Sequence, residues 1–411
     1  MLKAHTQSRK VYNVVRRVAS PLPIFLFVSL FIYLLLTFLF GFQSLSSRFD
    51  AEATAKLYSE IVEAAEKGIF LVKPGAGDDT LYAYAGWRYM QGVSPDQILF
   101  EHPPLGKYLI GLSIAVFGNQ NMLGFILGAC TLILLYLTAA ELGGRGVITL
   151  APVLLALDRL FITFSHISFL DIYMLFFLTL STYLFTKALK QTKLLIPFSI
   201  AYGLAVACKW TAAFLILPLA LTLVIKRRWS TLTYLAATIP LSLAAYTATY
   251  LIYFTSGHTI QDFINLQYQM LQYQEARRYL IGFVPGELLI NLQTGITFLN
   301  VLSGLFNPLL WPLILPASAL SIIYYISKRE GYRDLLPPIT TIGMLTPFLH
   351  GQVYIWYLLP TLTIGYLTIA NTLQHIYEDA KRKKLAAAAI TAYIIAAATW
   401  SITWVGDIWL R

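Results

Sequence analysis

Charged residues and cysteines are both scarce in this sequence of 411 residues. Asp, Glu, Lys and Arg make up only 12% of it, against about 25% in soluble domains, while 57% is hydrophobic. The two cysteines, Cys130 and Cys208, lie far apart in apolar segments, which excludes a disulfide framework and a cysteine-based metal cluster. No stretch alternates polar and apolar residues as barrel strands do. The composition therefore predicts an all-α integral membrane protein.

The apolar runs approach the 20 residues or so that a helix needs to cross a bilayer. The first, "PLPIFLFVSLFIYLLLTFLFGF", is longer than a typical signal-peptide core and no small-residue cleavage site follows it, so we expect a retained first span. The sequence predicts about eleven spans in a single domain over 1–411. They fall near residues 22–41, 121–141, 147–165, 168–187, 194–208, 211–225, 231–254, 306–327, 335–349, 355–374 and 385–405, with one long helix over 194–225 as an alternative.

The net charge is +10, but the positions of the basic residues are more informative, because Lys and Arg concentrate in the cytoplasmic loops of membrane proteins. With the N-terminus inside, the cytoplasmic segments hold 19 of the 30 basic residues but only five of the 20 acidic ones. All six cytoplasmic segments agree with this orientation. The sequence thus predicts a cytoplasmic N-terminus and gives no reason to expect a nucleic-acid partner.

Two longer polar segments then lie on the outer side, 42–120 and 255–290. Residues 50–67 show the spacing of an amphipathic helix, and "PLGKYLIGLSIAVFG" is too short and too polar to span comfortably, so it predicts a helix at the membrane interface. Residues within 255–290 predict another surface helix.

The first outer segment carries two polar clusters. Adjacent carboxylates such as Asp78 and Asp79 repel each other unless a cation or a hydrogen-bond donor shares them; the plain alternative is a solvated helix cap. In "FEHPPLGK", two prolines fix the backbone that presents His102, with Lys107 just beyond. The plain alternative there is a turn into an interfacial helix with a snorkelling lysine.

Three further clusters fall beside apolar spans. "LDRLFITFSHISFLD" holds Asp158, Arg159, His166 and Asp171, and charge at membrane depth is a functional hypothesis by default, although the first two could form only a structural pair. Lys209 in "CKWTAAF" interrupts two apolar runs and could be a snorkelling lysine instead. The aromatic turn "HGQVYIWYLLP" resembles an interfacial belt.

Taken in order, these stretches resemble the dolichyl-phosphate-mannose protein mannosyltransferases, membrane glycosyltransferases of the GT-C class. That family has an acidic pair, HPP-x-x-K, a stretch ending S-R-x-x-x-x-D, and K-W-T, and the match here runs from about residue 78 to 214. Two positions depart from it, since Asp79 stands where Glu is usual and His166 where Arg is usual. The 255–290 loop is also too short for an inserted MIR domain, so the chain resembles a minimal prokaryotic member.

The resemblance implies inverting transfer of a sugar, mannose by analogy, from a polyprenyl-phosphate donor to a hydroxyl at the outer face of a prokaryotic plasma membrane. An acceptor hydroxyl needs a positioned base, for which Asp78 is the first choice and Asp79 the second. The leaving phosphate needs cations, for which Lys209, Arg159 and Lys107 are candidates. We expect His102 to orient the acidic pair or contact the phosphate, with His166 and Asp171 in support.

The resemblance implies no cofactor and no metal, although Asp78, Asp79 and His102 would form an incomplete ligand set. The acceptor stays open between a protein Ser or Thr and a lipid or glycan. A transporter is a rival from another class, since Asp158, Arg159 and Lys209 could line a pathway, but the two related halves usual in transporters are not evident. A non-catalytic scaffold is a further, weaker alternative.

Overall fold

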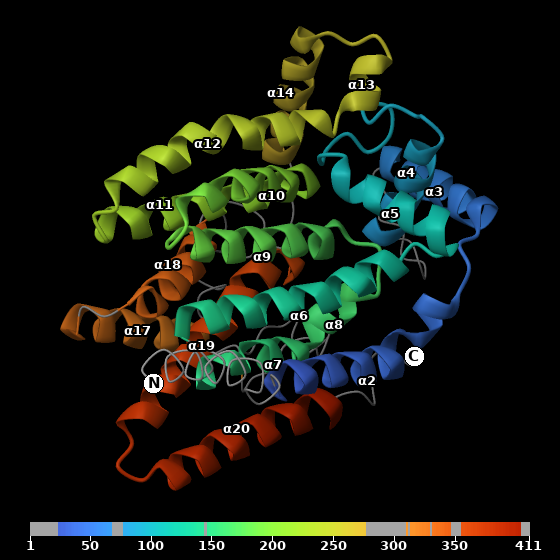
Figure 1. Ribbon diagram of the computed structural model, residues 1–411. Coiled ribbons are helices and arrows are strands. Elements are labelled where there is room, and N and C mark those ends of the chain that lie inside the picture. Colours follow the sequence, from blue (N-terminus) through green and yellow to red (C-terminus); the bar gives the residue numbers. More distant parts are fainter. Residues whose placement is uncertain are drawn as a thin grey trace, which may run out of the picture.

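The computed structural model describes residues 24–67, 77–143, 146–276, 310, 313–328, 331–346 and 355–403, and its regular elements within these ranges are all helices. Figure 1 shows a stack of roughly parallel helices, with α12 (Trp229–Ala248), α10 (Leu195–Cys208), α9 (Leu170–Ala188), α6 (Met122–Gly143) and α2 (Ile24–Ser46) following one another across the molecule. Shorter helices gather at the two ends of this stack. The expected all-helical membrane fold is confirmed at this level.

Among the residues that the structure describes, two helices, α2 and α6, are long and apolar enough to cross a membrane by themselves. A third candidate is broken: α7 (Ala151–Ala156), which follows η1 (Val147–Leu150), and α8 (Arg159–Ser165) meet at an angle of 59°. Several other apolar helices in the described part of the chain are only 10–17 residues long. The count of eleven spans therefore stays a prediction.

Helix α10 ends at Cys208, and Lys209 then adopts an extended backbone with φ −161° and ψ 133°. The chain continues as η3 (Trp210–Leu215) and α11 (Ile216–Ile225), so the alternative of one long helix over 194–225 is wrong. Helix α10 also packs closely on α12. The approach is so close that a Cβ added at Gly203 would lie 2.2 Å from the carbonyl oxygen of Ser242. A side chain at position 203 would force these helices apart.

One end of the stack, called the loop end below, carries three helices of the segment 42–120, which the sequence predicts to lie outside (Figure 1). Asp50 caps α3 (Ala51–Glu66) by accepting from the Ala53 N–H at 2.9 Å, so the helix expected at 50–67 is confirmed. Helices α4 (Asp78–Met90) and α5 (Leu105–Phe117) touch at two glycines: a Cβ on Gly111 would lie 2.2 Å from the carbonyl oxygen of Gly86. The loop end also holds α13 (Leu251–Thr255) and α14 (Ile260–Ala276), the helix expected within 255–290.

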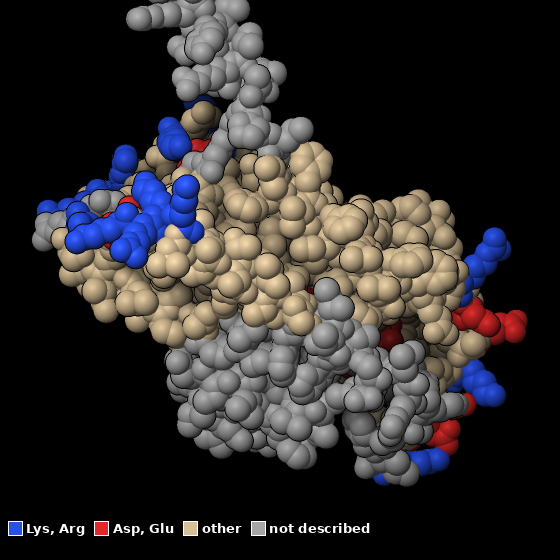
Figure 2. Space-filling view, turned by 90° about the horizontal axis from the view of Figure 1, so that it is seen from below, with Lys and Arg blue, Asp and Glu red and all other residues tan. Residues whose placement is uncertain are grey.

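The opposite end, called the basic end below, holds α17 (Ile314–Lys328), η5 (Tyr332–Asp334), α18 (Leu336–Gly343) and the turn between α19 (Leu359–Asp379) and α20 (Lys383–Thr403). Figure 2 shows Lys and Arg gathered at this end, a broad band almost free of charge, and acidic and basic residues together at the loop end. The band is apolar at its surface: on α2, Phe31 is 66% exposed and Phe38 63%. Such exposure is favourable against lipid and unfavourable against water, as expected for an integral membrane protein.

Candidate functional site

The acidic pair begins helix α4. Asp78 and Asp79 are its first two residues, where the helix dipole and unpaired N–H groups favour negative charge. Gly77 precedes them, and a Cβ there would lie 2.7 Å from a carboxylate oxygen of Asp79. Burial raises the pKa of the Asp79 carboxyl above 3.8, the backbone N–H of Thr80 opposes that rise, and the charge of Asp78 adds to it. The Asp79 carboxyl therefore does not titrate as an isolated surface acid.

A buried ion pair joins two segments that are far apart in sequence. Both carboxylate oxygens of Asp171, in the first turn of α9, accept from the ammonium of Lys209 at 2.8 Å. The exposed fractions of these side chains are only 0% and 4%. The ring of Tyr357, in η7 (Ile355–Leu358), lies 4.2 Å below the same ammonium. The interruption between α10 and η3 thus places a desolvated cation against an acid and an aromatic face.

Tyr82 of α4 lies between these groups. Its ring contacts His102 edge-on at 6.2 Å and Phe169 at 6.1 Å. Burial raises the pKa of its hydroxyl far above 10, and the nearby charges of Asp78, Glu101 and Asp171 add to the effect. The structure therefore brings the acidic pair, the His102 loop and the Asp171–Lys209 pair around one tyrosine. We call this group of segments the candidate site.

The turn between α8 and α9 holds α4 in place. The Ser168 hydroxyl donates to the backbone carbonyl of Asp79 at 2.9 Å. Phe169, next in the chain, packs on Tyr82 and on Trp356. The segment that matches the S-R-x-x-x-x-D stretch, with His166 in place of Arg, thus contacts the backbone of the acidic pair through Ser168, while its Asp171 reaches Lys209. Residues 350–354 of the aromatic turn lie outside the described residues.

Lys107 points into the His102 loop. Its ammonium is fully buried and donates to the backbone carbonyls of Leu99 and of His102, the latter at 2.9 Å. Burial lowers the pKa of Lys107 to about 8. Leu99 has a φ of 52°, a left-handed conformation that non-glycine residues seldom adopt. This lysine fastens the loop that carries His102.

Arg159, the first residue of α8, and His166, which follows its last residue, both lie against α2. The Arg159 guanidinium lies 5.6 Å from the ring of Phe40, and a Cβ on Gly41 would come within 2.6 Å of the His166 ring. Both side chains are 7% exposed, and Nδ1 of His166 finds no hydrogen-bond partner among the described residues. The structure thus sets these two residues against the first long helix.

Asp158 is the N-cap residue of helix α8. Its carboxylate accepts from the backbone N–H groups of Leu160 at 2.8 Å and Phe161 at 3.2 Å. Its other oxygen accepts from the hydroxyl of Tyr366 on α19. A helix that begins inside an apolar core needs such a cap, because its first N–H groups have no partner within the helix. The contacts described for Asp158 are structural.

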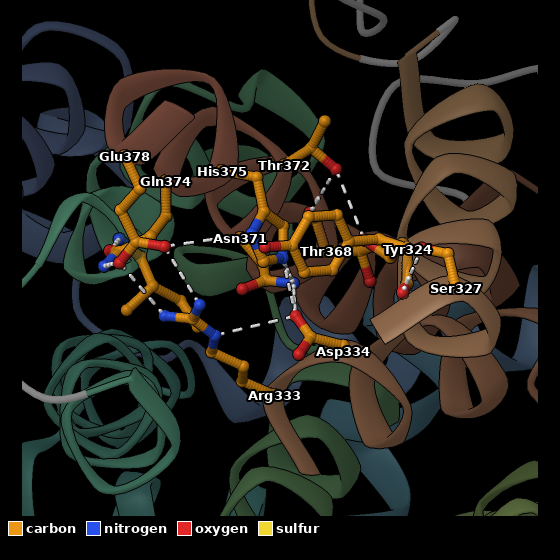
Figure 3. Close-up of polar contacts among 12 residues, drawn as sticks. Tyr324, Ser327, Arg333, Asp334, Thr368, Asn371, Thr372, Gln374, His375 and Glu378 are labelled. Carbon is orange, nitrogen blue, oxygen red and sulfur yellow. Dashed lines mark hydrogen bonds and ion pairs between the residues drawn. The ribbon is translucent and has the colours of Figure 1, made fainter. Parts of the chain in front are cut away.

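A second polar network joins η5 and α19 at the basic end, and Figure 3 shows its side chains. Arg333 makes a bidentate pair with Glu378, and the Asp334 carboxylate accepts from His375 at 2.6 Å and from Asn371 at 3.1 Å. These contacts tie η5 to α19. From the sequence, Arg333, Asp334 and Glu378 were counted only as inner charges. Asn371 and His375 were not singled out, although their i, i+4 spacing on α19 was a usable signal.

Tyr82 was not among the predicted site residues, although its position one helical turn after Asp78 indicates that the two side chains lie on the same face of the helix. The structure brings Asp78, His102, Asp171 and Lys209 to one region, and it places Lys107 within the loop. Among the described residues, no three His, Cys, Asp or Glu side chains are grouped as ligands for a metal ion.

Comparison with known proteins gives a family match over part of the chain and solved structures with the same fold. The family model described as dolichyl-phosphate-mannose-protein mannosyltransferase matches residues 101–253. The match includes His102, Lys107, Asp171 and Lys209, whereas the acidic pair precedes it. The expected resemblance is therefore confirmed over this part of the chain. A comparison with curated protein sequences finds no match.

Solved structures with the same fold include ArnT and the oligosaccharyltransferase AglB. ArnT from Cupriavidus metallidurans in its apo state is 15% identical with a TM-score of 0.57, covering 78% of this chain and 58% of its own. The same protein bound to undecaprenyl phosphate gives 0.56 at 15% identity, covering 84% and 62%.

The archaeal oligosaccharyltransferase AglB from Archaeoglobus fulgidus, in complex with an inhibitory peptide and a dolichol-phosphate, gives a TM-score of 0.52 at 14% identity, covering 92% of this chain and 55% of its own. The present chain thus spans between 55% and 62% of the length of these three structures.

Proposed function

We propose that this protein is a polyprenyl-phosphate-dependent glycosyltransferase that moves a sugar to a hydroxyl acceptor at the outer face of a prokaryotic plasma membrane. One observation carries the proposal: a buried ammonium, Lys209, is held by Asp171 beside an acidic pair at a helix N-terminus. A cation for a leaving phosphate and a base for an acceptor hydroxyl are the two demands of such a transfer.

Asp78 is the proposed general base. Deprotonating the acceptor hydroxyl as it attacks the anomeric carbon accelerates such reactions by about 10²–10⁴-fold. The half-buried Asp79 beside it shapes the charge state of the pair. Tyr82, between Asp78 and His102, closes the site on the side of α4.

Lys209 is the proposed cation for the leaving phosphate. Its ammonium is prepositioned by Asp171, so little reorganisation is needed as charge develops on the phosphate oxygen. Arg159 and His166 are proposed as a second contact for the lipid phosphate, next to α2. Lys107 takes a different role from the phosphate contact first expected: it holds the loop that presents His102.

The donor class is supported by the solved relatives, since ArnT was solved with undecaprenyl phosphate and AglB with a dolichol-phosphate and a peptide. Mannose as the sugar is supported by the family match. A protein Ser or Thr is one acceptor class, and a lipid or glycan hydroxyl is the other. About eleven spans, a cytoplasmic N-terminus and the absence of a metal cofactor belong to the same proposal.

The test is transfer of radiolabelled sugar from polyprenyl-phosphate sugars by purified protein in lipid, with a threonine-containing peptide and a lipid extract as acceptors. We expect Asp78→Asn to abolish transfer without changing the melting temperature, because it removes charge at constant size. Asp50→Asn, at the cap of α3, is the matched control and should retain transfer.

Full activity of Asp78→Asn would exclude this residue as the base. Label that appears only in the lipid fraction would keep the reaction class and exclude the peptide acceptor. If no acceptor receives label and the donor does not bind, the transporter alternative replaces the enzyme. A parallel assay with a chelator tests the proposed independence from metal ions.

A further inference from the structure

We infer that α14, the helix of the second outer segment, positions the candidate site by holding two of its segments at once. It contacts the His102 loop directly through Gln274, and it is linked to the Lys209 turn through Gln267 and the hydroxyl of Tyr246 on α12. This inference rests on the proposed function for its effect on catalysis, but not for its structural content. Within α14, the two glutamines are positioning residues, since each would act through a residue of the site.

The first contact joins the end of α14 to the loop before His102. The side-chain amide of Gln274 donates to the backbone carbonyl of Glu101 at 2.8 Å. Beside it, the ring of Tyr273 packs edge-on against Phe100 at 5.6 Å. The hydrogen bond spans 173 positions of sequence. On its other side, the same loop is fastened by Lys107, so the backbone of His102 is held from two directions.

The second contact is a relay from α14 to the residue after Lys209. The indole N–H of Trp210 donates to the hydroxyl of Tyr246 at 3.0 Å. That hydroxyl in turn donates to Oε1 of Gln267 on α14 at 2.5 Å. Because Tyr246 lies on α12, the relay crosses three elements and ends where α10 is interrupted. It fixes the orientation of the turn that aims Lys209 at Asp171.

An apolar cluster supports both contacts. Its buried members come from the end of α10, from α12 and α13, and from the inner face of α14, and Phe100, Leu105 and Trp210 pack against it from the two site segments. The buried members are Ala207, Tyr246, Tyr250, Tyr253, Phe263, Leu266 and Met270. Buried groups of this kind move together, because close-packed interiors transmit displacement. Hydrogen bonds at both ends and a shared core make α14 a bracket between the two segments.

The structural part is tested by the accessibility of position 101. Glu101 contributes its backbone carbonyl to the bracket, so Glu101→Cys leaves that contact available; Cys130→Ala and Cys208→Ala remove the two native thiols. In this background we expect Gln274→Glu, which removes the donor at constant shape, to speed labelling by a membrane-impermeant maleimide about tenfold, a local opening of about 1.4 kcal/mol. Gln274→Lys retains an N–H donor and should label at the parent rate. Gln272→Glu adds the same charge at an exposed position of α14 and is the control.

The catalytic part is tested by transfer rates of the same substitutions in the otherwise native chain. We expect Gln274→Glu to lower the rate about 10- to 100-fold, as a displacement of about 1 Å does at an enzyme site, with Gln274→Lys restoring it and Gln272→Glu leaving it unchanged. Tyr246→Phe, which breaks the relay, should lower the rate without changing the labelling of position 101. Equal labelling rates in all variants would refute the inference that α14 holds the His102 loop in place. Wild-type protein inactive with every donor would instead overturn the proposed function, and the labelling result would still decide the bracket.

Discussion

The Asp171–Lys209 pair allows a prediction that separates a structural role from a chemical one. Both of its contacts measure 2.8 Å, and neither side chain is more than 4% exposed. Lys209→Met leaves a carboxylate buried without its cation. Removing one partner of such a pair typically lowers the free energy of unfolding by about 3–5 kcal/mol. We expect a loss of this size, measured by reversible unfolding in mixed micelles.

A matched surface pair provides the control. Lys190 and Glu141 lie at a similar distance, 2.7 Å, but the lysine side chain is 68% exposed. Exposed pairs contribute about 0–1 kcal/mol because water and salt screen them. Lys190→Met should therefore change the free energy of unfolding by less than about 1 kcal/mol and leave transfer unchanged.

The double substitution Asp171→Leu with Lys209→Met supplies the decisive comparison. Replacing a whole buried ion pair with apolar residues is often neutral or stabilising by about 1–4 kcal/mol, so the double variant should regain most of the stability lost by Lys209→Met. Transfer should stay absent, because no cation remains for the leaving phosphate. Recovery of transfer together with stability would refute the chemical role of Lys209, and a single-variant loss below about 1 kcal/mol would refute the burial argument.

Three other predictions concern the acidic pair, the His102 loop and the basic end. Burial raises the pKa of Asp79 above the usual 3.8, so its carboxyl group keeps its proton to a higher pH than a solvated aspartic acid does. Asp79→Asn removes this titration, so we expect the acidic limb of the pH–rate profile to move to lower pH, whereas Asp79→Glu, with the residue usual in the family, should keep transfer. Lys107→Met leaves the carbonyls of Leu99 and His102 without their donor, so transfer should fall and proteolysis near residue 100 should quicken; unchanged values of both would contradict the fastening role. Burial opposes ionisation of Glu378, but hydrogen bonds from Arg333 and Gln374 outweigh it and hold the pKa of Glu378 below 4.5. An acid with a lowered pKa stabilises the fold above its unfolded pKa and loses that contribution as the pH falls through its folded pKa. The melting temperature of the wild type should therefore fall below about pH 4.5 more steeply than that of Glu378→Gln.

Local features were predictable from the sequence, and long-range ones were not. The helix at 50–67 carried its own cap and periodicity, and the charged Lys209 between two apolar runs marked the interruption that the structure shows after Cys208. The role of Lys107 was missed, because a basic residue in a motif does not reveal which way its ammonium points. The Gln274 contact was also invisible, since nothing in the local sequence relates that residue to Glu101.

The number of spans was hard to predict for a related reason. Hydropathy detects continuous apolar length, whereas this chain breaks its apolar helices at Asp158, at Lys209 and after Ala248. Each break frees backbone groups that lipid cannot satisfy. The protein must then supply polar side chains that pair with these backbone groups. In a sequence, such side chains cannot be distinguished from charged residues with a catalytic role.

Contacts with the backbone offer a physical criterion for telling the two apart. Asp158 accepts from two N–H groups of α8, and Lys107 donates to two carbonyls of its loop, so both satisfy groups that the fold itself leaves unpaired. The ammonium of Lys209 instead contacts a carboxylate and an aromatic face in the structure. Since a buried ion pair is a weak source of net stability compared with apolar packing, its presence supports the proposal that Lys209 also serves the donor phosphate. Buried charges that face other side chains, as Lys209 does, are therefore better candidates for a chemical role than exposed pairs such as Lys190–Glu141 or charges that fasten the backbone, such as Lys107.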